Sequence, residues 1–312
     1  MKEYVFNYYP EFKCVAKKCK HTCCSGWKMN IDQKTLSEYK NNTTPFSQTL
    51  KKGVNFKKSQ FKSDKAGRCA FLNNDGLCAL IINLGEESLC QVCRDHPRFR
   101  SFYNDRTETG LGFCCEEATK IILNFKDKLQ PILLTDDQTD CELDFNQKNL
   151  LEFRMCALDI VQDRTLDINE RIKKLLSLCN ADVCYKDFGK ILKTFLSFER
   201  LDKDWIKRLK SIKNAPSIKP IDQSLSIPCE QFLANEIFRH VPDAEDTMWV
   251  RARVIASLFA WWIIKSIYDL ETLDKADLNT LIDVVRAYSA EVEYSEKNLD
   301  KLFNFSYKFI KL

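Results

Sequence analysis

Cysteine side chains are concentrated near the start of the chain, at spacings that suit metal ligation. The stretch CKHTCC at residues 19–24 holds three cysteines in six positions, and Cys14 precedes it by five. Cytosolic thiols stay reduced, so thiols gathered in this way indicate metal binding or catalysis rather than disulfides. Ten of the fifteen cysteines lie before residue 116: Cys14, Cys19, Cys23, Cys24, Cys69, Cys78, Cys90, Cys93, Cys114 and Cys115.

The cysteine spacing favours an iron–sulfur cluster over a single zinc ion. Zinc sites commonly use two short cysteine pairs, and here Cys90 and Cys93 form the one CxxC pair. Neighbouring side chains diverge on a helix or a strand, so we expect Cys23 and Cys24 to serve different sites. A cluster is larger and takes four thiolates from separate segments. Zinc, and the absence of a metal, remain the alternatives.

Arginines and a tryptophan lie beside these cysteines in the sequence. Cations stabilise the reduced form of a cluster, but the arginines can equally pair with Asp95 or Glu116. Trp27 follows the first cysteine group and either shields a cluster from water or simply packs. The three arginines follow the CxxC pair closely: Arg94, Arg98 and Arg100.

Short elements are expected to position the cysteines. The stretch CAFLNNDGLCALII predicts a hairpin turn at Asn74-Asp75-Gly76, with Cys69 and Cys78 on its two arms. Residues 51–68 carry seven basic side chains against one acidic side chain, Asp64. This composition is typical of a solvated loop, or of a basic surface that approaches an acidic partner.

From about residue 145 the apolar positions follow a helical period. Residues 254–264 form the longest apolar stretch, and the segment Leu258–Ile264 is apolar on all sides, so it predicts a central buried helix. The five later cysteines have no ligand spacing and are expected to be small buried hydrophobes: Cys141, Cys156, Cys179, Cys184 and Cys229. The predicted stripes include Leu150, Phe153, Ala157 and Ile160; Ile172, Leu175, Leu176 and Cys179; and Leu278, Leu281, Ile282, Val285, Tyr288 and Val292.

Composition and length exclude several classes of protein. A net charge of +4 from 48 basic and 44 acidic residues does not indicate nucleic-acid binding. The start of the chain has no apolar run typical of a signal peptide, and residues 254–264 fall short of the roughly twenty that a membrane span needs. We therefore expect a cytoplasmic protein of mainly α class. A cysteine-rich metal-binding region of short strands and loops, 1–130, would precede a helical bundle, 145–312.

Four stretches, in order, resemble the flagellin lysine-N-methylase family, known as FliB. Looser similarity continues at DIVQDRTLDINERI (Asp159–Ile172), at FLANEIFRHV (Phe232–Val241) and in the apolar helix after Arg253. The four N-terminal stretches are CVAKKCKHTCCSGWKMNID (Cys14–Asp32), CAFLNNDGLCALI (Cys69–Ile81), LCQVCRDHPR (Leu89–Arg98) and CEEATKIIL (Cys115–Leu123).

The resemblance implies methyl transfer from S-adenosylmethionine to lysine side chains of flagellin, in the context of the bacterial flagellum. It also implies one or two iron–sulfur clusters of the 4Fe-4S type. This sequence has Glu116 where the family often has proline and His96 where it often has an aromatic residue, while Cys114 is additional. The family's cysteines fall on Cys14, Cys19, Cys23, Cys24, Cys69, Cys78, Cys90, Cys93 and Cys115.

Familiar cofactor motifs for this chemistry are missing from the sequence. It has no glycine-rich loop between a strand and a helix, and Gly110 and Gly112 are more typical of a turn. It also lacks the CxxxCxxC run of radical S-adenosylmethionine enzymes. Two other functions therefore stand beside the methyltransferase: a metal-stapled protein that binds flagellin or another partner without catalysis, and an iron–sulfur electron-transfer protein.

Overall fold

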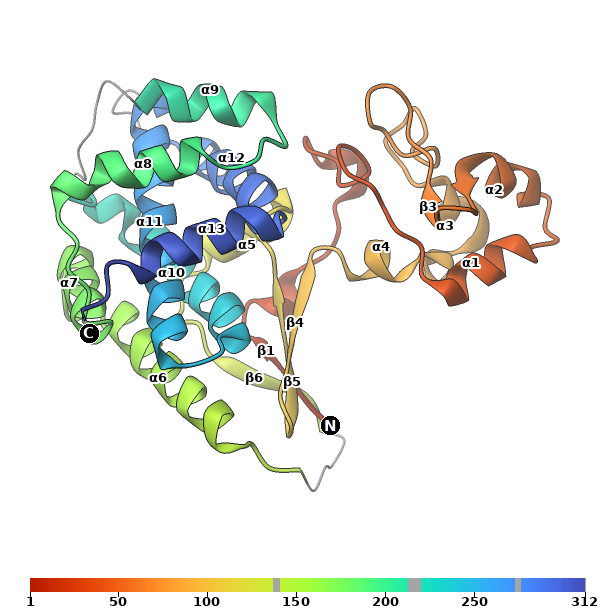
Figure 1. Ribbon diagram of the computed structural model, residues 1–312. Helices are drawn as coiled ribbons and strands as arrows, with labels where there is room; N and C mark the ends of the chain where they lie inside the picture. Colours follow the sequence, from red (N-terminus) through yellow and green to blue (C-terminus); the bar gives the residue numbers. More distant parts are fainter. Residues whose placement is uncertain (137–140, 213–219, 273–275, 312) are drawn as a thin grey trace. The chain divides into compact units, whose positions relative to one another are not determined.

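The computed structural model describes residues 1–136, 141–212, 220–272 and 276–311. They form two compact units: unit 1 contains Met1–Phe12 and Phe99–Leu312, and unit 2 contains Lys13–Arg98 (Figure 1). This division differs from the predicted regions 1–130 and 145–312. The reason is a sheet, because the first strand of the chain pairs with strands beyond residue 98 and so joins the helical part.

Unit 1 contains a four-stranded sheet in the order β4-β5-β1-β6. The second strand in this order, β5, runs parallel to β1, with Lys2 opposite Arg106 and Val5 opposite Thr109. On its other side β1 pairs antiparallel with β6, whose residues are all exposed. The strands are β1 (Lys2–Phe6), β4 (Arg98–Phe102), β5 (Arg106–Leu111) and β6 (Pro131–Asp136).

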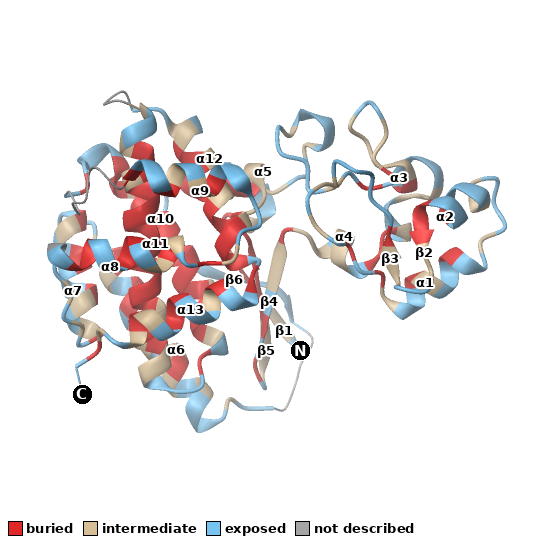
Figure 2. Cartoon of the chain, turned by 45° about the horizontal axis from the view of Figure 1, so that its top comes forward, coloured by how far each residue is buried: buried red, intermediate tan, exposed pale blue. Residues whose placement is uncertain are grey.

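Helices make up the rest of unit 1, around two central buried helices, α10 and α11. Both helices are buried along most of their length (Figure 2). The protein is thus mainly α as predicted, but a sheet accompanies the predicted bundle. The helices are α5 (Glu116–Asn124), α6 (Phe145–Val161), α7 (Ile168–Leu178), α8 (Phe188–Leu196), α9 (Lys203–Ser211), α10 (Ser226–His240), α11 (Thr247–Thr272), α12 (Leu278–Tyr288) and α13 (Glu296–Tyr307).

The predicted apolar stripes face the core of unit 1. On α6, Leu150 and Ala157 are buried, and on α12 Leu281 and Val285 are fully enclosed. The predicted central helix is part of α11, which extends well beyond residues 258–264. Among the described residues it is the one helix long and apolar enough to cross a membrane, but 72% of its most apolar window is buried inside the protein. Core helices of water-soluble proteins pass the same test of length and composition.

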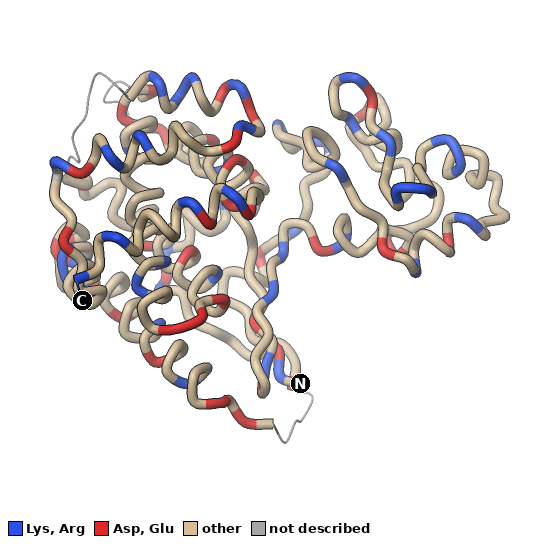
Figure 3. The backbone as a smooth tube through the Cα atoms, viewed as in Figure 1, with Lys and Arg blue, Asp and Glu red and all other residues tan. Residues whose placement is uncertain are grey.

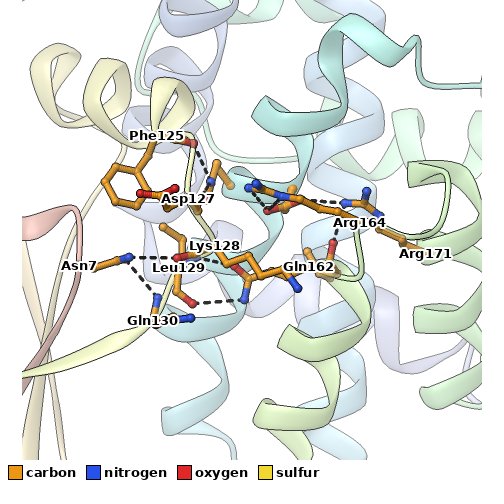
Figure 4. Close-up of polar contacts among 12 residues, drawn as sticks. Asn7, Phe125, Asp127, Lys128, Leu129, Gln130, Gln162, Arg164 and Arg171 are labelled. Atoms are coloured by element: carbon orange, nitrogen blue, oxygen red, sulfur yellow. Dashed lines mark hydrogen bonds and ion pairs between the residues drawn. The ribbon is translucent and has the colours of Figure 1, made fainter.

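A polar network fixes the segment that joins α5 to β6 (Figure 4). The side-chain amide of Gln162 donates to the carbonyl oxygen of Leu129 at 3.2 Å and accepts from the Leu129 N–H at 2.5 Å. The side-chain amide of Gln231 donates to the carbonyl oxygens of Phe125 and Asp127, both at 2.8 Å. Nearby, Arg171 contacts the buried carboxylate of Glu230 at 2.7 Å. Buried backbone groups in this connection therefore have partners, as an ordered loop requires.

Unit 2 has its own small core, in which cysteines take part. Eleven hydrophobic side chains are buried there, and two of them are Cys69 and Cys90. Its helices are short and lie between turns, so the prediction of short elements and loops is confirmed for this unit. They are α1 (Gln33–Lys40), α2 (Ser47–Gly53), α3 (Ala79–Leu84) and α4 (Gln91–Asp95), and the strands are β2 (Val54–Asn55) and β3 (Gln60–Phe61), which pair antiparallel.

Candidate metal centre

Asp32 positions the CxxC pair. One oxygen of its carboxylate accepts from the backbone of Thr35 at 2.9 Å and so caps α1. The other accepts from the backbone of Gln91 at 2.9 Å, at the start of α4. Cys90 is the residue that precedes α4, and Cys93 lies within its single turn. Side-chain capping of free helix N–H groups is a common device, and here it joins the first and third cysteine motifs.

The turn between Cys69 and Cys78 brings these two residues together. The Asn73 side chain accepts from the backbone of Leu77 at 2.8 Å, and Gly76 takes the positive φ of 74° that the turn needs. An isolated bridge then pairs Leu72 with Cys78. The predicted turn is confirmed, but the second arm is not a strand, because Cys78 leads directly into α3.

A second backbone contact places Cys24 next to Cys69. The Cys69 N–H donates to the carbonyl oxygen of Cys24 at 2.8 Å. Immediately afterwards Gly26 turns the chain with a φ of 90°, and its N–H donates to the carbonyl of Gly67 at 3.1 Å. The first cysteine motif is thereby held against the turn that precedes Cys69.

Five thiols gather in the core of unit 2, from Cys24, Cys69, Cys78, Cys90 and Cys93. Burial raises the pKa of Cys69 to about 11, and the neighbouring thiols of Cys24, Cys78 and Cys90 oppose its ionisation as well. A hydrogen bond between Cys90 and Cys93 lowers the pKa of Cys90 and raises that of Cys93. Thiolates crowded in this way repel one another, and a bound cationic centre relieves that repulsion.

The spacing of these sulfurs can be compared with that of a zinc site. Tetrahedral zinc–sulfur bonds of about 2.3 Å place the sulfurs about 3.8 Å apart. In the part of the chain that the structure describes, the one group of three or more metal-binding side chains with ligand atoms within 4.8 Å of one another contains no cysteine. No three of the five thiols are therefore within that distance of one another.

The other predicted ligands lie outside this core, although the Cys23 side chain hydrogen-bonds that of Cys24. Cys14 and Cys23 are exposed, and Cys19 is half-buried with its thiol donating to the carbonyl of His21 at 3.2 Å. Cys115 belongs to unit 1, where it precedes α5. The structure therefore brings together five of the nine predicted thiols within unit 2.

Cys23 and Cys24 do not diverge as expected. A hydrogen bond from the Cys23 side chain lowers the pKa of Cys24 to about 7. These residues form a turn rather than a helix or strand, so the rule for regular structure does not apply. The Trp27 indole N–H also donates to the Cys23 carbonyl at 2.7 Å, which draws the ring back over this turn.

The residues around the CxxC pair do more than place positive charge beside it. The Arg94 guanidinium donates to the carbonyl oxygens of Leu89 and Glu87 at 2.6 and 3.3 Å, so it shapes the loop before Cys90. Burial lowers the pKa of His96 to about 4, which keeps its ring neutral at pH 7. Its centroid lies 6.3 Å from the Trp27 ring. His96 therefore resembles an aromatic residue in its packing.

The five later cysteines and Gly110 lie outside the group of five thiols. Cys179 and Cys229 are fully buried as predicted, but Cys141, Cys156 and Cys184 are exposed, so that prediction is wrong for three of five. Gly110 lies close to the ring of Phe99. A Cβ at this position would clash with that ring, and this packing accounts for the glycine.

The seven basic side chains of residues 51–68 are all exposed, and Figure 3 marks the positions of the lysines and arginines along the backbone of unit 2. They are not on one loop, since the segment includes the end of α2 and both strands of the β2–β3 pair.

Sequence reasoning missed a buried group of side chains in unit 1 that could hold a metal ion: Glu236, His240 and Glu293. The available signal was the spacing of Glu236 and His240, four apart on a helix, which places both on one face. Glu293 is far away in the sequence, and nothing in the residue pattern connects it to the other two.

Comparisons with known proteins agree with the motifs. The chain is 30% identical over 126 residues to lysine-N-methylases of Salmonella typhimurium and Salmonella choleraesuis, covering 38% of this chain and 31% of each relative. It thus spans about a third of their length. No family model and no solved structure matches. The flagellar biosynthetic protein FliU of Salmonella muenchen is 30% identical over 126 residues, and the match covers 75% of that protein. The chain therefore belongs to the FliB and FliU family of lysine-N-methylases.

Proposed function

We propose that the protein is a lysine N-methyltransferase that transfers a methyl group from S-adenosylmethionine to lysine side chains of flagellin. The observation that carries this proposal is the match to proteins named lysine-N-methylase and to the flagellar protein FliU. The gathered thiols of unit 2 support a metal cofactor in the same protein.

The proposed cofactor is an iron–sulfur cluster of the 4Fe-4S type, held by four of the five gathered thiols of unit 2. Such a cluster supplies a redox centre, and its binding energy contributes to the folding of the segment that holds it. Five thiols suit one cluster with one additional cysteine, so we favour one cluster over two in unit 2.

The methyl transfer itself makes two demands on the protein. A C–N bond to the lysine Nζ forms as the methyl–sulfur bond breaks, and S-adenosylhomocysteine leaves. The attacking amine must be neutral, although the pKa of a free lysine is about 10.4. A base must therefore accept a proton from the ammonium group, and a dry, aligned site favours the transfer.

Exposed lysines provide a means to guide an acidic partner. Lys57, Lys58 and Lys62 are all exposed on or beside the β2–β3 pair. Long-range attraction between such a surface and a negatively charged face of flagellin would raise the association rate at low salt.

The decisive experiment measures the mass of flagellin. Anaerobically purified protein is incubated with S-adenosylmethionine and unmodified flagellin, and intact mass spectrometry is expected to show additions of about 14 Da, one methylene each. A Cys93→Ser variant is expected to give no addition, whereas Cys156→Ser, altered at an exposed cysteine, retains activity. An unchanged flagellin mass with cluster-loaded wild-type protein would instead support a non-catalytic partner-binding or electron-transfer role.

A further inference from the structure

A buried acidic and histidine group in unit 1 has the geometry of a metal site. Glu236 and His240 lie one turn apart on α10, and Glu293 ends the π-helical turn Ser289–Glu293 that follows α12. The His240 Nε2 is 3.1 Å from Glu293 Oε1 and 3.7 Å from Glu236 Oε2. Two ligand atoms that are each about 2.1 Å from one ion lie roughly 3.0–3.4 Å apart.

Glu236 and Glu293 differ from the other buried glutamates of unit 1, because each has one carboxylate oxygen without a hydrogen-bond partner. Glu108 uses both oxygens to bind Arg154, and Glu230 likewise uses both to bind arginines. By contrast, Glu236 Oε1 and Glu293 Oε2 are fully enclosed and have no hydrogen-bond partner. Their side chains are 1% and 0% exposed. Buried oxygens without partners are costly.

Two carboxyl groups face one arginine at this position. Arg239 Nη1 lies 2.7 Å from Glu293 Oε1, which compensates for one carboxylate. The Glu236 carboxyl group contacts the Tyr288 hydroxyl at 3.5 Å, the His240 ring at 3.7 Å and the side chain of Glu293. A second cation is therefore needed if both acids are ionised, because an uncompensated buried charge is strongly unfavourable.

The backbone that carries Glu293 is also irregular. A π-helical turn is rare and is frequent at functional sites, and here it places Glu293 opposite the α10 pair rather than continuing α12. The Arg253 guanidinium holds the end of α10 by donating to the carbonyl of His240 at 2.6 Å. Both sides of the group are thus fixed before any ion binds.

We propose that Glu236, His240 and Glu293 bind a divalent first-row metal ion that ties α10 to the Ser289–Glu293 turn. Two carboxylates with one imidazole suit Mn²⁺, Fe²⁺ or Zn²⁺, and they lack the thiolates that an iron–sulfur cluster requires. The site is composed of unit 1 residues alone and is independent of the five thiols.

Manganese distinguishes this site from the cysteines, because Mn²⁺ prefers oxygen and nitrogen ligands to thiolates. The full-length protein is dialysed against EDTA, loaded with Mn²⁺ and desalted. Elemental analysis is expected to show about one manganese per chain, and Mn²⁺ is expected to raise the melting temperature, since an ion that binds the folded state stabilises it. Cys93→Ser protein is expected to retain this manganese, so the result does not depend on the cluster or on methyl transfer.

Matched variants complete the test. Glu236→Gln and His240→Asn are expected to lose at least nine-tenths of the manganese, while Glu291→Gln, on the same turn, and His21→Asn retain it. If Glu236→Gln is poorly folded, the wild-type protein still decides the question through its manganese content and its melting temperature. Wild-type protein that retains no manganese and shows no Mn²⁺-dependent stabilisation would show the group to be a structural ion-pair network only. Full manganese in folded Glu236→Gln would equally overturn the assignment.

Discussion

The two units are built on cores of different kinds. Unit 1 encloses aromatic and aliphatic side chains along α10 and α11, including the fully buried Trp261 and Phe232. The core of unit 2 has eleven buried hydrophobic side chains, and two of them are Cys69 and Cys90. Apolar burial contributes about 25 cal/mol per Å², so this small core provides less stabilisation than the larger core of unit 1.

This difference indicates what holds each unit together. Unit 1 combines an extensive buried apolar core with paired buried charges such as Glu108 and Arg154. Unit 2 combines short helices, isolated bridges and crowded thiols. In small domains with a weak core, metal binding commonly supplies the missing folding energy. We therefore propose that a bound metal stabilises unit 2, whereas apolar packing stabilises unit 1.

The largest predicted effect is the loss of structure in unit 2 when iron is removed. Treatment with an iron chelator in air is expected to leave amides of unit 2, such as those of Met29 and Phe61, exchanging rapidly with solvent. Amides of α10 and α11 are expected to remain protected, because their core is apolar. Hydrogen-exchange mass spectrometry measures both. Equal protection of the unit 2 amides with and without iron would contradict the proposal that unit 2, unlike unit 1, depends on the metal for its structure.

The second effect lies in unit 1 and does not involve metal. Arg154→Met leaves the buried carboxylate of Glu108 without its partner, which is expected to cost about 3–5 kcal/mol. The double variant Arg154→Met with Glu108→Leu is expected to recover much of this loss. Chemical denaturation measures the free energy of unfolding. Iron content per chain is expected to stay unchanged in both variants, and its loss would show that the two units depend on each other.

A smaller effect is expected from the cysteines of the helical unit. Cys179→Ser places a hydroxyl in a fully buried apolar position and is expected to cost about 1–3 kcal/mol. Cys156→Ser, at an exposed position on α6, is expected to change the free energy of unfolding by less than about 0.5 kcal/mol. Thermal melts of the two variants compare their stabilities. Iron content per chain is measured as well, and its loss in either variant would indicate a metal ligand outside unit 2.

The smallest effect concerns partner binding by the basic surface of unit 2. Replacing Lys57, Lys58 and Lys62 with glutamate is expected to weaken flagellin binding several-fold at low salt and less at high salt, where charges are screened. The matched control replaces Lys148, Lys203 and Lys207 of unit 1, which are also exposed. Surface plasmon resonance at two salt concentrations measures both. An equally large loss of flagellin binding in the control variant would show that the effect depends on net charge rather than on this surface.

The sequence predicted local features better than long-range ones. The period of α6, α7 and α12 and the turn near Gly76 depend on neighbouring residues, so they could be recognised. The pairing of β1 with β5 depends on residues about a hundred positions apart, such as Lys2 and Arg106, and no short pattern encodes it. For the same reason the CxxC pair was recognised, whereas the capping of α4 by Asp32 was not.

Iron and acid-labile sulfide per chain test the central claim most directly. Both are measured after anaerobic purification of wild type, Cys90→Ser, Cys93→Ser and Cys179→Ser, because a serine hydroxyl is a poor substitute for a thiolate ligand. We expect about four iron and four sulfide per chain, as one 4Fe-4S cluster holds, in wild type and in Cys179→Ser, and strong loss of both in the other two. Full iron and sulfide in both Cys90→Ser and Cys93→Ser, or stoichiometric zinc without sulfide in wild type, would contradict it.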